Sequence, residues 1–229
     1  HNACRHRATR LVDAPCTKAI TCPYHAWTYD LAGALIHVPH ADRFTLDGRW
    51  DFQLLPRPEA EPTPDGWHET DVPSLWTRRG TTDLPQYTNV QMPWPLRPPD
   101  IPDENPTGDY RRTFAVPTGF LADGARAVLR LDGVDSAFRA WVNGLEVGRS
   151  VGSRLPVELD VTDALTADGD NVLAVRVHQW SSASYLEDQD MWWLSGIFRD
   201  VTLLARPGGG LDDVFVHADY DAATGTGRL

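Results

Sequence analysis

The chain has 229 residues and a formal net charge of −11, from 32 acidic and 21 basic side chains. Such a charge repels phosphate backbones and anionic membrane surfaces, so we expect neither nucleic acid nor a membrane as a partner. Hydrophobic residues make up 41% and charged residues 23%, which is typical of a soluble globular protein and excludes general disorder. No apolar run approaches the roughly 20 residues that a membrane-spanning helix requires.

Residues 1–43 differ in character from the rest of the chain. They contain all three cysteines, Cys4, Cys16 and Cys22, and five of the eight histidines. Cysteines confined to this segment cannot cross-link the remainder, which favours a reducing cytoplasm or a local metal site over a secreted disulfide scaffold. We therefore predict a domain boundary near Phe44.

The segment 56–106 is dense in proline, tryptophan and short polar breaks, which excludes long helices and favours strand edges or ordered loops. From residue 110 onward, short runs rich in valine and leucine alternate with turn residues, and none shows a sustained helical period. The predicted strands are 110–116, 127–131, 137–142, 146–150, 157–160, 172–177 and 198–204. This pattern predicts an all-β fold, a two-layer β-sandwich or jelly roll.

Two turns support this prediction. Asn143-Gly144 supplies the two positive-φ positions of a tight hairpin turn between alternating flanks. A second turn at 168–171 precedes strand 172–177, whose Leu173, Val175 and Val177 should share one buried face.

We expect Trp50 and Trp141 to lie in the core.

Gly208-Gly209-Gly210 indicates a linker, which is followed by a predicted strand at 214–218. Residues 207–229 would then begin a further, incomplete domain.

Cysteine and histidine alternate near the N-terminus in two half-motifs, Cys4-x-His6 and Cys22-x-x-His25. Two thiolates and two imidazoles could bind tetrahedral zinc, or a [2Fe–2S] cluster with both cysteines on one iron. Zinc fingers usually place their histidines together, so one histidine after each cysteine favours iron–sulfur. Chance occurrence is the remaining alternative.

The stretches NACRHR and CPYHAWTYDL around these half-motifs resemble the Rieske domain of ring-hydroxylating oxygenase large subunits. The resemblance implies that Cys4 and Cys22 ligate one iron and that His6 and His25 ligate the other, with no role for Cys16. It covers about residues 1–43 and includes neither the strands that normally precede the first half-motif nor the mononuclear-iron domain.

Three polar and aromatic stretches, 87–90, 102–114 and 184–193, lie between strand-like segments. Loops on a rigid β scaffold commonly present binding groups. Carboxylates and amides can pair with sugar hydroxyls, and aromatic faces can pack against sugar rings. These stretches are therefore candidates for a carbohydrate site.

Residues 44–206 are similar to glycoside hydrolase family 2 β-galactosidases. The similarity rests on the segments 48–50, 71–74, 105–108, 133–138, 152–156 and 186–200. In that family the domain is a jelly roll that completes the rim of an active site seated in a later (β/α)8 barrel. The resemblance implies that Asn89 reaches sugar hydroxyls. It also implies that Asp190 contacts the galactosyl ring and helps to ligate a sodium ion, whose other ligands come from the barrel.

Glu187, Asp188 and Asp190 do not form a catalytic pair in this interpretation. The resemblance places the acid/base and nucleophile glutamates in the barrel, beyond residue 229. We expect Glu187 and Asp188 to belong to a hydrogen-bonded loop that fixes Asp190. The chain departs from the family's pattern at Trp180-Ser181-Ser182 and at Val151, so no structural magnesium site is assigned.

The leading hypothesis is the N-terminal, galactoside-contacting domain of a β-galactosidase. In it a Rieske-like fragment precedes residue 44, residues 207–229 start an immunoglobulin-like domain, and the chain alone performs no hydrolysis. One alternative is a Rieske electron-transfer module of an aromatic-ring dioxygenase, with the sandwich as a docking domain. Another is a non-functional chimera, joined near Phe44 by gene rearrangement or faulty assembly. The natural galactoside and the oligomeric state of the parent enzyme stay open.

Overall fold

The computed structural model describes residues 43–207 apart from positions 90, 96, 118, 122, 123 and 168. It also describes the strand residues 20–21, 28–29 and 35–37 and the hairpin 219–228. The described residues form an all-β protein, as predicted, and their one α-helix is the single turn α1, Ser184–Glu187. No helix in the described part is long and apolar enough to cross a membrane.

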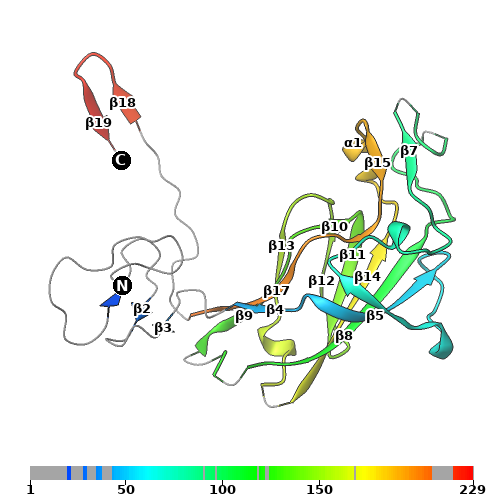
Figure 1. Ribbon diagram of the computed structural model, residues 1–229. Coiled ribbons are helices and arrows are strands. Elements are labelled where there is room, and N and C mark those ends of the chain that lie inside the picture. Colours follow the sequence, from blue (N-terminus) through cyan, green and yellow to red (C-terminus); the bar gives the residue numbers. More distant parts are fainter. Residues whose placement is uncertain are drawn as a thin grey trace.

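Two antiparallel sheets face each other and form the sandwich (Figure 1). The six-stranded sheet has the order β12 (Leu145–Val151), β11 (Ala137–Val142), β14 (Asp170–His178), β8 (Thr107–Ala115), β5 (Gly48–Leu55) and β6 (His68–Val72). The four-stranded sheet has the order β13 (Val157–Asp160), β9 (Arg126–Leu131), β17 (Val201–Arg206) and β4 (Arg43–Thr45).

Smaller pairs extend this architecture. β10 (Val134–Asp135) pairs with β16 (Gly196–Ile197), and β7 (Gln86–Thr88) pairs with β15 (Met191–Trp193). The hairpin near the C-terminus consists of β18 (Asp219–Asp221) and β19 (Thr226–Arg228). The three strands before the sandwich are β1 (Ile20–Thr21), β2 (Thr28–Tyr29) and β3 (Leu35–His37). Short 3-10 turns lie at Pro64–Gly66, Trp76–Arg78 and Thr162–Ala164.

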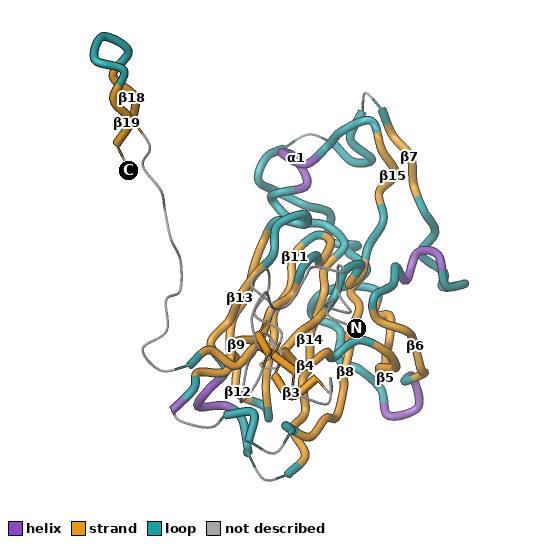
Figure 2. Tube along the Cα trace, turned by 60° about the vertical axis from the view of Figure 1, so that its left-hand side comes forward, coloured by secondary structure: helices purple, strands orange, loops and turns teal. Residues whose placement is uncertain are grey.

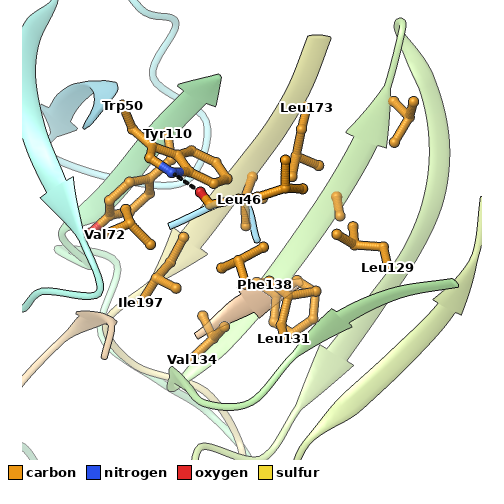
Figure 3. Packing of buried hydrophobic residues seen from close by; sticks show 14 of the residues in the cluster. Leu46, Trp50, Val72, Tyr110, Leu129, Leu131, Val134, Phe138, Leu173 and Ile197 are labelled. Atoms are coloured by element: carbon orange, nitrogen blue, oxygen red, sulfur yellow. Dashed lines mark hydrogen bonds between the residues drawn. The ribbon is translucent and has the colours of Figure 1, made fainter. Parts of the chain in front are cut away.

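The core lies between the two main sheets (Figure 3). Leu173, Val175 and Val177 of β14 are at most 1% exposed, which confirms the predicted buried face of this strand. The indole nitrogen of Trp50 donates to the carbonyl oxygen of Leu46 at 2.8 Å, so this large core side chain buries no unsatisfied donor.

The hairpin between β11 and β12 is built as predicted. Asn143 and Gly144 have φ values of 51° and 82°, which a residue with a bulky side chain rarely adopts. The Asn143 side chain also accepts a hydrogen bond from the Val172 amide and donates to the side chain of Asn171. The turn is therefore tied to the start of β14.

The structure corrects three sequence predictions. The predicted strand 198–204 begins three residues too early, because residues 198–200 lie in no strand and β17 begins at Val201. Residues 87–88 and 191–193 form strands β7 and β15 and are not loops. Trp141 is only half-buried, because its neighbours Ala140 and Val142 point into the core and the alternation of the strand turns its own side chain outward. The predicted strand 214–218 lies outside the described residues.

Replacing Leu173 with alanine should lower the free energy of unfolding by about 2–5 kcal/mol, because the cavity opens in the middle of the core. The matched control is Leu145→Ala in the β11–β12 hairpin, where the side chain is 57% exposed and the change should stay within about 0.5 kcal/mol. Urea denaturation followed by tryptophan fluorescence measures both. Equal losses in the two variants would contradict the assigned core.

Candidate functional site

Asn89 and Asp190 are brought together by the β7–β15 ribbon, which projects with α1 from one end of the sandwich (Figures 1 and 2). In this antiparallel pair Thr88 lies opposite Met191. Asn89 immediately follows Thr88, and Asp190 immediately precedes Met191, so the two side chains occupy the same end of the ribbon. Both residues are exposed to solvent.

Tyr87 lies between the two and links them. Its hydroxyl donates a hydrogen bond to Oδ1 of Asp190. This bond is the main cause that raises the pKa of Tyr87 above its ordinary value of 10.0, and the side chain of Asn89 acts on the same hydroxyl in the opposite direction. The phenol thus orients the carboxylate and the amide at one small surface.

An aromatic face borders this surface. Trp192 is 57% exposed, and its ring centroid lies 5.6 Å from that of Tyr87 at an interplanar angle of 48°. Exposed indole beside an amide and a carboxylate is the combination that a sugar requires, since pyranose rings have an apolar face and a polar edge.

A cluster of packed aromatic side chains connects the ribbon to the sandwich. The Trp94 ring lies 4.6 Å from Trp180 and 5.9 Å from Tyr185, and Trp180 lies 5.2 Å from Trp193. The Trp94 indole donates to the Tyr185 hydroxyl at 2.9 Å, and that of Trp193 donates to Thr88 at 2.7 Å. These contacts hold a projecting element that would be too short to be stable alone.

Asn105 fixes the start of the same loop. Its side chain is 1% exposed, donates to the Trp180 carbonyl at 2.9 Å and accepts from the Trp180 amide at 2.8 Å. It therefore replaces a strand partner for Trp180 just beyond the end of β14.

Glu187 forms hydrogen bonds within the scaffold, as expected. Its carboxylate accepts from both the amide and the hydroxyl of Ser153, each at 2.6 Å, and so connects α1 to the segment that follows β12. Asp188 differs, because its Oδ1 is buried and has no hydrogen-bond partner within the described residues. Sequence reasoning did not single out Asp135, which pairs with Arg154 at 3.0 Å beside the same serine.

The described residues hold no group of three or more His, Cys, Asp and Glu side chains that could bind a metal ion. The predicted iron ligands Cys4, His6, Cys22 and His25 lie outside the described residues. Asp190 lies within them and can offer one carboxylate to a cation.

Comparisons with known proteins identify the family of the sandwich. The model of the family "Glycosyl hydrolases family 2, sugar binding domain" matches residues 44–207. The beta-galactosidase of Arthrobacter sp. (strain B7) is 48% identical over 206 residues, which cover 80% of this chain and 20% of that protein. The beta-galactosidase of Vibrio vulnificus (strain YJ016) is 47% identical over 198 residues, or 83% of this chain and 19% of that protein. The chain thus spans about a fifth of the length of these relatives.

Solved structures show the same fold. A beta-glucuronidase from an uncultured Clostridium sp. has a TM-score of 0.59 at 27% identity, covering 82% of this chain and 33% of its own. A beta-glucuronidase from Bacteroides uniformis has a TM-score of 0.53 at 26% identity, covering 72% of this chain and 18% of its own.

The jelly-roll sandwich that this family model matches is a carbohydrate-binding domain. The chain belongs to the family 2 glycosyl hydrolases through their sugar binding domain. It corresponds to the N-terminal, sugar-binding part of the β-galactosidases that it matches, without their remaining length.

A second family model, the Rieske [2Fe-2S] domain, matches residues 1–57. Its last part overlaps the sugar binding domain, and the structure places those shared residues in β4 and β5 of the sandwich. Trp50 and Phe52 of β5 are at most 2% exposed in the sandwich core. The residues that both family models match therefore fold as part of the sandwich.

Asp135 generates a pH-dependent prediction. Burial raises the pKa of its carboxyl from 3.8 to about 6, against the opposing effects of Arg154 and Ser153. Because the folded-state pKa is the higher one, its contribution to stability is complete below pH 4 and is lost as the pH rises through about 6. The loss amounts to about 2–3 kcal/mol.

The variant Asp135→Asn should lack this fall. Urea denaturation at pH 4.5 and 7.5 should show the wild type losing stability relative to the variant at the higher pH. Asp163→Asn, which changes an exposed acid in the 3-10 turn Thr162–Ala164, is the control and should keep the wild-type profile. Parallel pH profiles for wild type and Asp135→Asn would contradict the assignment.

Proposed function

We propose that this chain is the substrate-contacting N-terminal domain of a β-galactosidase, in which Asn89 and Asp190 bind the terminal β-D-galactoside. Their convergence on the Tyr87 hydroxyl is the observation that carries the proposal. A carboxylate accepts from sugar hydroxyls, and an amide both donates and accepts. Tyr87 keeps Asp190 in one orientation, which reduces the ordering cost of binding.

The pocket is incomplete in this chain. One carboxylate and one amide leave most hydroxyls of a galactoside facing water, so we infer that a (β/α)8 barrel in the missing length supplies the rest. The two glutamates that cleave the glycosidic bond would come from that barrel. This chain contributes binding and orientation and does not hydrolyse galactosides alone.

Asp190 would also hold the sodium ion of the parent enzyme. Sodium prefers oxygen ligands, and the carboxylate of Asp190 can provide one while also contacting the sugar. The remaining ligands would come from the barrel. We assign no magnesium site to this chain.

The proposal can be tested in a chimera. Residues 44–206 of this chain replace the corresponding segment of the Arthrobacter beta-galactosidase, and hydrolysis of a chromogenic β-galactoside is measured. The wild-type chimera should be active, and Asp190→Asn should lower kcat/KM on the order of 100-fold, since a charge-assisted contact to the sugar is lost. Asn89→Ala should lower kcat/KM by about tenfold.

Asp163→Asn is the matched control, because it makes the same chemical change in the 3-10 turn beside the β11–β12 hairpin, outside the ribbon. It should leave kcat/KM unchanged. An active chimera in which Asp190→Asn behaves like Asp163→Asn would refute the proposed role of Asp190.

A second function is favoured by the Rieske match at residues 1–57. The donor set fits the group, because two cysteines and two histidines are the ligands of a Rieske [2Fe–2S] cluster. Cys4 and Cys22 would hold one iron and His6 and His25 the other, and the cluster would supply one-electron transfer. In this interpretation the sandwich would serve as a docking domain.

Iron and acid-labile sulfide analysis of the purified chain tests this function. A bound cluster requires two of each per chain, lost in Cys22→Ser and retained in Cys16→Ser, which removes the cysteine without an assigned role. If the chain is iron-free when purified from cells that assemble such clusters, the N-terminal segment resembles a Rieske domain in sequence but does not bind a cluster. That result would favour the alternative of a non-functional joining of two sequences near Phe44.

We propose the following domain division. Residues 1–43 form the Rieske-like segment, residues 44–206 form the sugar-binding jelly roll, and residues 207–229, with the β18–β19 hairpin, start an immunoglobulin-like domain. The confinement of cysteine to the first segment supports a cytoplasmic location.

A further inference from the structure

A hollow lies on the outer face of the six-stranded sheet, away from the β7–β15 ribbon. The strand register aligns Trp141 of β11, Ala174 of β14 and Arg111 of β8 in one row across the sheet. Neighbouring strands lie about 4.8 Å apart, so the backbones of Trp141 and Arg111 are separated by about 10 Å. Only the methyl group of Ala174 stands between their side chains, and this leaves the hollow open.

The segment between β5 and β6 forms another wall of this hollow. Pro62 and Trp67 from that segment line it, and its volume is about 330 Å³. The Arg111 guanidinium lies 4.5 Å from the centroid of the Trp67 ring, and that of Arg139 lies 5.0 Å from the centroid of Trp141. Two indoles thus border the hollow, each held by a planar cation.

An ion pair at one end of the hollow holds polar groups in fixed positions. Arg176 and Asp109 form a two-pronged ion pair, with both N–O distances 2.7 Å, and their side chains are 18% and 11% exposed. Arg176 also donates to the carbonyl oxygen of Pro58 at 3.1 Å. Such a pair presents donors and acceptors in a rigid arrangement.

The charges around the hollow are balanced. Arg111 pairs with Asp51 at 3.2 Å, Arg139 pairs with Glu146, and Arg176 pairs with Asp109. Each arginine that lines the hollow therefore already has a carboxylate partner. Since the whole chain carries a net charge of −11, an anionic ligand is disfavoured.

A protein partner is also disfavoured. Trp67 and Trp141 are half-buried, and neither belongs to the large hydrophobic side chains that the described part of the chain exposes. Surfaces that dock another protein usually expose a contiguous apolar patch, whereas here ion pairs surround a single hollow. Flat aromatic walls beside ion pairs whose charges cancel match the apolar face and hydroxyl edge of a pyranose ring.

We propose that this hollow is a second carbohydrate site, which binds one ring of a neutral pyranoside between Trp141 and the wall formed by Trp67 and Arg111. It is separate from Asn89 and Asp190 and would hold a sugar unit that is not cleaved. The site is complete within this chain, so it needs no barrel.

The test uses the full chain and nuclear magnetic resonance of its indole N–H groups. Methyl β-D-galactopyranoside and methyl β-D-glucopyranoside are titrated, with the anionic methyl β-D-glucuronide as comparison. Small open sites bind single sugars weakly, so we expect a Kd of about 1 mM for at least one neutral pyranoside. The signals of Trp67 and Trp141 should shift, and the glucuronide should bind more weakly.

Ala174→Leu fills the hollow without removing a wall and should raise that Kd on the order of tenfold or more. Ala115→Leu makes the same change at an exposed position of β8, four residues from Arg111 and on the same outer face of the sheet. It should leave the Kd unchanged. Thermal unfolding checks that both variants fold. Trp141→Ala provides a second variant, with loss of binding expected.

Asp190→Asn separates this proposal from the proposed function. Binding that survives in Asp190→Asn and disappears in Ala174→Leu supports the second site, whatever the chimera shows. If only the indole signal of Trp192 shifts, and if this shift is lost in Asp190→Asn, the second site is overturned and the proposed role of Asp190 is supported. The second site is also overturned if no neutral pyranoside shifts the signals of Trp67 and Trp141.

Discussion

The antiparallel pairing of β14 with β8 is the constraint on which the rest of the structure depends. Nine residues of each strand are in register, from Asp170 opposite Ala115 to His178 opposite Thr107. This register fixes the inner row that packs in the core and the outer row that contains Ala174. The pairing continues past His178, because the Gln179 amide bonds to the Pro106 carbonyl and Asn105 holds Trp180. The loop that carries Asp190 therefore starts from the most extensively paired strand of the sheet.

The ribbon at the rim shows how weak local structure can present rigid groups. β7 and β15 contribute only three residue pairs, which could not persist alone in water. Edge-to-face indoles, the Tyr87 hydroxyl and the contact between Glu187 and Ser153 hold the ribbon. The site therefore depends on packing that no single loop provides.

Local signals in the sequence predicted most of the sandwich. The alternation at Leu173, Val175 and Val177 and the Asn143-Gly144 turn depend on neighbouring residues, and both predictions are confirmed. The same alternation along β11 places Trp141 outside the core, so hydrophobic character alone is a poor guide to the burial of this side chain. The β7–β15 pairing joins residues about a hundred positions apart, and no local pattern records such contacts. The resemblance predicts Asn89 and Asp190 as site residues, whereas the hydrogen bond from Tyr87 to Asp190 is visible only in the structure.

The position of β4 bears on how this sandwich can be joined to other sequences. Among the strands that the structure describes, β4 is the last of the four-stranded sheet and pairs with β17. A polypeptide that precedes β4 in the sequence therefore joins the sandwich at the edge of this sheet and does not disrupt the hydrogen bonds between its strands. Unrelated segments could therefore be exchanged at that point during evolution while the jelly roll kept its own stability, which makes the entry strand a natural splice point for modular proteins.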